Sequence, residues 1–160
     1  KYYEIAEEAH NTIKFYREDP EAQIPEIAYN GSSGAFDIRA TKTVTIPAHG
    51  RAEVPNGLRI MIPEGYYTKF AAKSGLYFKQ NVQPYEGLID FGYTGELACM
   101  MVNNSDVDVT IKKGQKYCQM EVFKIPEYSV EEATKQEFEN YRNSGNNTRK
   151  DGGFGSSGIF

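Results

Sequence analysis

Residues 87–96 combine a carboxylate, an aromatic ring and three glycines within ten positions. Asp90 could orient or deprotonate a water molecule, and Tyr93, three residues on, could stack against a sugar. Glycines at this density predict a tight hairpin whose backbone groups can face a ligand. A purely structural hairpin would have the same composition, so this segment alone leaves both readings open.

Two further segments have the composition of an anion site. Residues 73–75 read Lys-Ser-Gly, which supplies a charge, a donor and close backbone approach to a phosphate. Residues 149–158 place Arg149 ahead of a Gly/Ser run that could wrap a polyphosphate, and Phe154 within it could stack on a base. The alternatives are an ordinary loop at 73–75 and a flexible linker or tail at 149–158.

Two more segments each carry one polar side chain among apolar neighbours. Asp37, at the start of a predicted strand, is either a turn residue or a functional acid. Gln119 follows the turn at Lys113-Gly114 and alternates with apolar residues. It needs a partner if it points inward, or faces water if its strand lies at a sheet edge.

The elements that must position these residues are mostly strands. Short apolar stretches punctuated by Pro, Gly and Asn predict strands over residues 43–46, 51–54, 58–62, 66–72, 88–91, 96–102, 107–111 and 116–125. Strands at this spacing indicate a sandwich or barrel. Residues 97–102 are apolar on both faces, which predicts a fully buried strand.

The two ends of the chain differ from this pattern. Ser129 could cap a helix over residues 129–142, and residues 5–15 are a weaker helix or strand candidate. We therefore expect one β domain over residues 1–142, with an N-terminal extension at 1–12. A flexible arm follows at 143–160, which is rich in Asn, Gly and Ser.

Composition narrows the class of protein. The chain has 160 residues and a net charge of −4, which argues against stable nucleic-acid binding but not against a small anionic substrate. No apolar run approaches the ~20 residues of a membrane span, so no membrane association is expected. Cys99 and Cys118 have no metal-site spacing and are expected to be buried. An intracellular, cytoplasmic protein is expected, and a nuclear or virus-encoded one is also possible.

Together and in this order, the five segments resemble the five motifs of the homotrimeric dUTPase family, over about residues 25–158. The resemblance implies an all-β fold, a distorted jelly-roll-like barrel with one short helix and a flexible C-terminal arm. It implies magnesium-dependent hydrolysis of dUTP to dUMP and pyrophosphate by attack of water on the α-phosphorus, which keeps uracil out of DNA. It also implies a homotrimer whose arms are exchanged between subunits.

The resemblance assigns roles to individual residues. Asp90 would activate the water, Arg149 would act on the phosphates from the arm, and Asp37 would hold magnesium through a water molecule. Tyr93 would lie beneath the deoxyribose and leave no room for a 2′-hydroxyl. The implied substrate-binding residues are Lys73, Ser74, Gly75, Gly87, Ile89, Tyr93, Gln119, Phe154, Gly155, Ser156 and Ser157.

The chain departs from the family pattern at several positions. Lys73 stands where arginine is usual, so the charge is kept but the two-nitrogen fork is lost. Gly92 stands where a second aspartate is common, and Gln83 or Asn81 is the candidate for the uracil-contacting asparagine. The region 127–148 is longer than usual.

Two alternatives are kept. One is a dCTP deaminase of the same fold, against which residues 88–90 and Phe154 argue. The other is a trimeric regulatory or binding protein with reduced turnover, which Lys73 and the long region 127–148 favour. A regulatory protein partner in addition to catalysis is also left open.

Overall fold

The computed structural model describes residues 12–160. The predicted extension at 1–12 and most of the candidate element at 5–15 lie outside the described residues. The chain divides into two compact units, one that ends at Pro126 and one over Glu127–Phe160. The stretch 127–142, expected to belong to the β domain, groups with residues 143–160 in the second unit.

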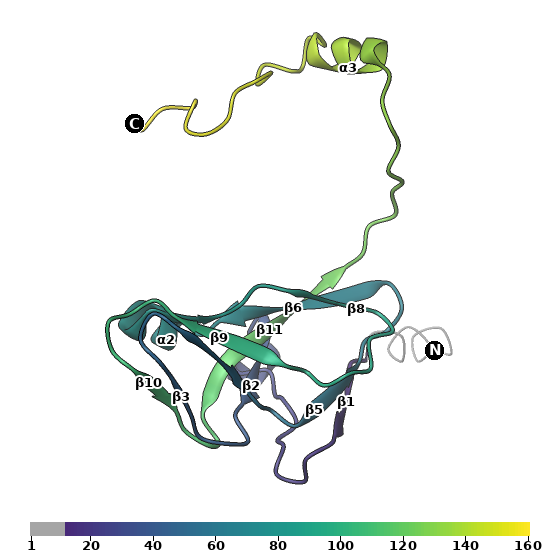
Figure 1. Ribbon diagram of the computed structural model, residues 1–160. Helices are drawn as coiled ribbons and strands as arrows, with labels where there is room; N and C mark the ends of the chain where they lie inside the picture. Colours follow the sequence, from purple (N-terminus) through teal and green to yellow (C-terminus); the bar gives the residue numbers. More distant parts are fainter. Residues whose placement is uncertain (1–11) are drawn as a thin grey trace. The chain divides into compact units, whose positions relative to one another are not determined.

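The first unit consists of antiparallel strands (Figure 1). A four-stranded sheet has the order β2-β11-β6-β8, a three-stranded sheet has the order β4-β9-β7, and two pairs, β1-β5 and β10-β3, complete it. The strands are β1 Lys14–Arg17, β2 Ala35–Arg39, β3 Val44–Ile46, β4 Arg51–Val54, β5 Leu58–Met61, β6 Tyr66–Ala72, β7 Val82–Pro84, β8 Leu88–Asp90, β9 Cys99–Asn103, β10 Val109–Ile111 and β11 Lys116–Lys124. The prediction of an all-β, jelly-roll-like fold is confirmed.

The core lies between the two larger sheets. Cys99 on β9 and Cys118 on β11 are both buried, and their Sγ atoms lie 3.7 Å apart. The buried hydroxyl of Tyr117 donates to the carbonyl of Val54 at 2.8 Å. Burial raises the pKa of both Tyr117 and Cys118, so both groups stay protonated and neutral at the centre of the unit. Burial of both cysteines agrees with the expectation from the sequence.

Three short elements were not predicted, and one of them is the 3-10 helix η1, Tyr29–Gly31. Helix α2, Ser74–Gln80, directly follows the lysine of the Lys-Ser-Gly segment, and strand β7 follows the helix. Helix α2 buries one residue, Leu76. A helical period in the sequence needs several buried apolar positions three or four residues apart, and α2 therefore shows none. The helix ends at Asn81, whose left-handed backbone (φ 56°, ψ 42°) caps it.

The second unit contains one helix, α3, over Lys135–Arg142 (Figure 1). The prediction that this helix starts at Ser129 is wrong. The hydroxyl of Thr134 accepts from the amide of Glu137, and the carboxylate of Glu137 accepts from the amide of Thr134. This reciprocal capping box satisfies two orphan donors and fixes the helix start. No helix in the described part of the chain is long and apolar enough to cross a membrane.

Candidate active site

The segment that carries Asp90 and Tyr93 is a tight turn at the end of β8. Strand β8 pairs with β6 and not with the segment that follows it, so the expected hairpin is a turn between strands of different sheets. The amide of Tyr93 donates to the carbonyl of Asp90 at 3.2 Å, and Gly92 has a left-handed φ of 89°. Glycine at 92 lets the chain reverse without strain.

Tyr93 is held by its own turn. Its hydroxyl donates to the carbonyl of Glu96 at 2.7 Å, so the ring lies across the backbone of the turn. A β-carbon added at Gly95 would come within 2.5 Å of the Tyr93 hydroxyl. Glycine at 95 therefore allows the ring to adopt this position.

A cavity of about 310 Å³ opens beside this turn. Its lining residues are Phe70, Gly87, Leu88, Ile89, Asp90, Tyr93, Glu96, Leu97 and Ala98. The structure thus brings together four of the predicted residues: Gly87, Ile89, Asp90 and Tyr93. Apolar and aromatic walls with one carboxylate suit a nucleoside, which needs stacking surface and few polar contacts.

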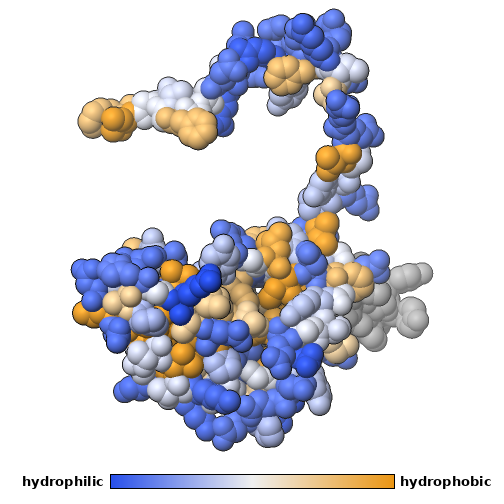
Figure 2. Space-filling model, in the orientation of Figure 1, coloured by the Kyte–Doolittle hydropathy of each residue, from blue (hydrophilic) through white to orange (hydrophobic). Residues whose placement is uncertain are grey.

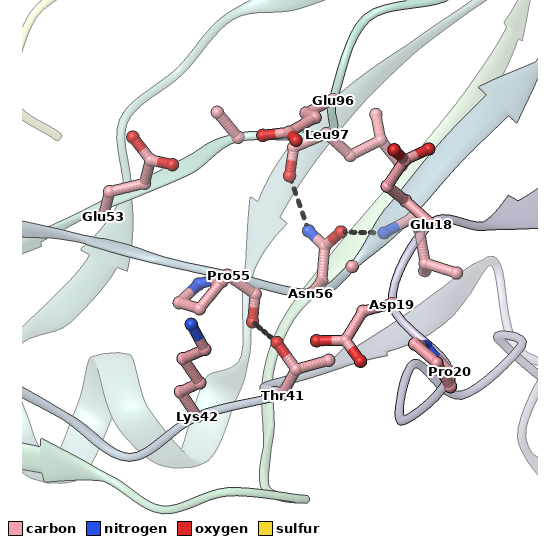
Figure 3. A pocket seen from close by; sticks show the side chains of 13 residues that line it. Glu18, Asp19, Pro20, Thr41, Lys42, Glu53, Pro55, Asn56, Glu96 and Leu97 are labelled. Atoms are coloured by element: carbon pink, nitrogen blue, oxygen red, sulfur yellow. Dashed lines mark hydrogen bonds between the residues drawn. The ribbon is translucent and has the colours of Figure 1, made fainter.

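A larger cavity, of about 420 Å³, also borders the segment 96–98 (Figure 3). Glu18, Lys42, Glu53 and Asn56 are among its lining residues. It contains none of the predicted site residues, although it shares the wall 96–98 with the nucleoside-sized cavity.

Asp37 lies at the centre of a charged cluster. The Lys73 ammonium lies 2.6 Å from Oδ1 of Asp37, and the Lys116 ammonium lies 3.2 Å from Oδ2. Burial raises the pKa of Asp37, but the hydrogen bonds and charges of Lys73 and Lys116 outweigh it and hold this pKa below its usual value. Asp37 is therefore a buried carboxylate ion and not a turn residue.

Gln119 lies opposite Asp37 across the β2–β11 ladder. The edge-strand reading of Gln119 is wrong, because β11 lies between β2 and β6. The side-chain amide of Gln119 donates to the carbonyl of Ala72 at 2.8 Å, directly before Lys73. Gln119 is thus placed at the same end of β6 as the Lys-Ser-Gly segment.

A third cavity, of about 400 Å³, opens beside Lys73 and Lys116 of this cluster. Its walls come from Lys73, Gly75, Leu76, Lys79, Gln80, Gln115 and Lys116. Lys79 and Lys116 were missed as candidate residues. Lys116 belongs to the same segment as Gln119, and Lys79 lies four residues after Gly75, a spacing that faces the same way once α2 is recognised. Three lysines with one nearby carboxylate give this cavity an excess of positive charge, which suits an anion.

The predicted arm residues all lie in the second unit. Arg149 donates from Nε to the carbonyl of Gly152 at 2.8 Å, and Ser156 donates its amide to Gly153 at 3.0 Å. Phe154 is fully exposed and has a left-handed φ of 48°, followed by Gly155 with a φ of 86°. Ser157 also lies in this series of turns, which leaves an aromatic ring uncovered in water.

The described residues form no group of three or more side chains able to hold a metal ion. Asp37 nevertheless has unused acceptor capacity, because an ionised carboxylate offers about four lone-pair sites and the lysines take two. A hydrogen bond to a metal-bound water therefore fits Asp37, and direct coordination by several protein ligands does not fit.

The first unit thus carries two separate half-sites, one suited to a nucleoside and one to a polyphosphate, which is the layout of a nucleotide-binding protein. A family model described as dUTPase matches residues 20–158. Curated relatives include a deoxyuridine 5′-triphosphate nucleotidohydrolase from Candida albicans, 31% identical over 94% of this chain and 91% of the relative. Another, from Paramecium bursaria Chlorella virus 1, is 37% identical over 81% of this chain and 87% of the relative. The chain belongs to the dUTPase family.

Solved structures agree on the fold. A mutant dUTPase of Staphylococcus bacteriophage 80alpha with dUpNHpp superposes with a TM-score of 0.79, at 21% identity, over 93% of this chain and 99% of that chain. A mutant dUTPase from phage phi11 of S. aureus, described as revealing the coordination of a structural Mg(II) ion, has a TM-score of 0.70, also at 21% identity. It covers 77% of this chain and 97% of the phage protein.

Proposed function

We propose that this protein hydrolyses dUTP to dUMP and pyrophosphate and so keeps uracil out of DNA. The observation that carries the proposal is the meeting of Asp90 and Tyr93 at one nucleoside-sized cavity in a chain of the dUTPase family. The lysine-lined cavity beside Lys73 and Lys116 gives the same unit a place for the phosphates.

Asp90 is the group we assign to the water. Its carboxylate is exposed and makes no hydrogen bond or ion pair within the described part of the chain, so it is free to accept a proton. A water molecule held by Asp90 would attack the α-phosphorus, and the pyrophosphate would leave. Tyr93 would lie under the deoxyribose, with Ile89 beside it, and the backbone near Gly87 would contact the uracil.

Lys73, Ser74, Gly75 and Gln119 would bind the phosphates, with Lys116 as an added cation. Arg149 would neutralise further charge from the arm. Gly155, Ser156 and Ser157 would donate to the phosphates, and the exposed ring of Phe154 would cover the uracil. Magnesium, the expected cofactor, would supply charge neutralisation at the triphosphate, and Asp37 would hold one of its waters.

We propose that the enzyme is a homotrimer with exchanged arms. The nucleoside-sized cavity and the lysine-lined cavity share no lining residue, so a neighbouring copy could complete each site. Apolar side chains gather on the visible surface of the β unit (Figure 2). Exposed apolar residues on or next to α2, β7 and β8 are Tyr77, Phe78, Tyr85, Leu88 and Phe91. Burying such residues is the ordinary driving force for assembly.

An intracellular, cytoplasmic setting is part of the same proposal, and the two free cysteines support it. A regulatory protein partner would find exposed Phe138 and Tyr141 on α3, beside a hollow of about 370 Å³. Glu131, Glu132 and Glu137 line the same hollow, so such a partner would be basic.

The test is pyrophosphate release with magnesium from dUTP, dCTP, dTTP and UTP. We expect rapid release from dUTP alone. Turnover of dCTP with release of ammonia would move the assignment to a deaminase of the same fold. Binding of dUTP without turnover of any nucleotide would support the regulatory protein and refute catalysis.

A further inference from the structure

The turn that carries Tyr93 is tied to strand β5 at its far end. A guanidinium nitrogen of Arg59 (Nη1) donates to the carbonyl of Thr94 at 3.0 Å. Arg59 and Glu96 also form an isolated antiparallel bridge, and the amide of Leu97 donates to the carbonyl of Leu58 at 3.0 Å. The segment directly after Tyr93 is therefore fixed against β5.

A buried asparagine fixes the end of this segment from the core side. The side-chain amide of Asn56 donates to the carbonyl of Leu97 at 2.7 Å, and its oxygen accepts from the amide of Leu58 at 3.0 Å (Figure 3). Asn56 is fully buried. Residue 97 is thus held by the core, while position 94 is held from the side chain of Arg59.

Glu18 sets the direction in which Arg59 points. Its carboxylate lies 2.9 Å from Nε of Arg59, and its own amide donates to the carbonyl of Gly57 at 2.9 Å. The guanidinium is planar, so a partner on Nε fixes the plane in which Nη1 reaches Thr94. The Arg59 side chain is half-buried, while Glu18 is exposed.

The bond from Tyr93 completes the chain of contacts. Its hydroxyl donates to the carbonyl of Glu96, within the segment that Arg59 and Asn56 hold. A shift of residues 94–96 would therefore carry the ring with it. The Tyr93 ring would exclude a 2′-hydroxyl by steric clash. A displacement of the ring by about 1 Å is enough to weaken this exclusion of ribose.

We propose that Arg59, held by Glu18, is a positioning residue that fixes Tyr93 at the sugar face and sharpens the choice of deoxyribose over ribose. This inference rests on the proposed function. Arg59 itself does not line the cavity. Its side chain acts on the turn through the carbonyl of Thr94, and its backbone pairs with Glu96, which does line the cavity.

The kinetic test compares Arg59→Ala, Arg59→Lys and Glu18→Gln with the wild-type enzyme, for dUTP and for UTP. In Arg59→Ala we expect the KM for dUTP to rise on the order of tenfold with kcat changed less than about threefold, because a misplaced Tyr93 ring weakens the contact with the sugar. The ratio of kcat/KM for dUTP to that for UTP should fall. Arg59→Lys and Glu18→Gln should lie between this variant and the wild type.

Arg51→Ala is the matched control, because Arg51 is exposed on β4 and makes no ion pair within the described chain. Its KM and its dUTP-to-UTP ratio should stay at the wild-type values. An Arg59→Ala enzyme with unchanged KM and unchanged ratio would overturn the positioning role, whatever its thermal stability.

Amide hydrogen exchange in the full chain separates this inference from the proposed function. Amides 91–97 should exchange faster in Arg59→Ala than in Arg51→Ala, since the side-chain tie to Thr94 is gone. Equal exchange in the two variants would overturn the inference. Failure of the wild type to hydrolyse dUTP would refute the proposed function instead.

Discussion

Lys73 and Asp37 form a close ion pair, with Nζ of Lys73 2.6 Å from a carboxylate that is only 8% exposed. The other carboxylate oxygen pairs with Lys116 at 3.2 Å. An arginine can engage both oxygens of a carboxylate with its two-nitrogen fork. In this protein two lysines, one directly after β6 and one at the start of β11, each pair with one oxygen of Asp37.

Replacing Asp37 by asparagine should destabilise the protein by about 2 kcal/mol at neutral pH, because two lysines lose their buried counter-charge. The folded-state pKa of Asp37 is lowered, so its contribution is present above the unfolded value of about 3.9 and is lost as pH falls through the folded value. Melting temperatures from pH 7 to pH 3 check this. The gap between wild type and Asp37→Asn should shrink below about pH 4, and parallel profiles would contradict the ion-pair account.

Lys79→Ala should raise the KM for dUTP about three- to tenfold and leave kcat nearly unchanged. Lys79 lines the anion cavity and has no ion pair within the described residues, so its charge is available to phosphate. The effect should weaken at high ionic strength, because salt screens exposed charges. Lys124→Ala, at the far end of β11, is the control. An equal change in both variants would show only a loss of net charge.

Asp90→Asn should lower kcat by at least about a hundredfold and leave nucleotide affinity within a few-fold of wild type. The amide keeps the shape of the side chain but cannot take a proton from water. Pyrophosphate release measures the first quantity, and calorimetric titration with dUTP measures the second. Asp106→Asn, on an exposed loop where Asp106 pairs with His49, should leave both unchanged. An active Asp90→Asn enzyme would remove Asp90 from its assigned role.

Gly95→Ala should leave the fold nearly as stable as wild type and impair substrate choice. The added methyl group would meet the tip of the Tyr93 ring, which is a side chain and can move away. Loss of the bond to Glu96 would then release the ring, so UTP should become a better substrate relative to dUTP. The comparison of kcat/KM for the two nucleotides decides the matter. An unchanged ratio would mean that the position of the ring does not control sugar selection.

Removal of everything after Thr148 should cut kcat/KM for dUTP by about a hundredfold or more without changing the melting temperature of the β unit. Residues 149–160 make up the C-terminal part of the second unit and contribute no strand to the sheets. The truncated chain would lack Arg149 and Phe154, the arm's cation and its exposed ring. Full activity in the truncated enzyme would refute a catalytic arm.

The strands could be predicted because each carries alternating or continuous apolar residues. The prediction of a fully buried strand over residues 97–102 is wrong, because Ala98 is exposed and Met100 and Val102 are half-buried, so only one face of β9 enters the core. Helix α2 could not be predicted, since Leu76 is its buried residue and three buried positions are needed to show a helical period. The start of α3 was predicted wrongly for a different reason. Both Ser129 with Glu132 and Thr134 with Glu137 match a capping box, and the sequence alone does not rank them.

Part of the candidate site could be predicted from the sequence and part could not. Asp90 and Tyr93 are close in sequence, so their turn could be recognised locally. The contacts of Asp37 with Lys73 and Lys116 depend on the register of β2 and β6 against β11, which places Asp37 and Ala71 opposite Gln119. Register is set by long-range packing, so the sequence alone does not place Lys116 beside Asp37.

The two buried cysteines can be used to measure how often the core of the β unit opens to solvent. Cys99 and Cys118 lie between the two larger sheets, and burial raises the pKa of the Cys118 thiol. Alkylating reagents need an accessible thiolate, so the folded core protects both residues. The rate at which an alkylating reagent labels the thiols therefore reports the frequency with which the two sheets separate.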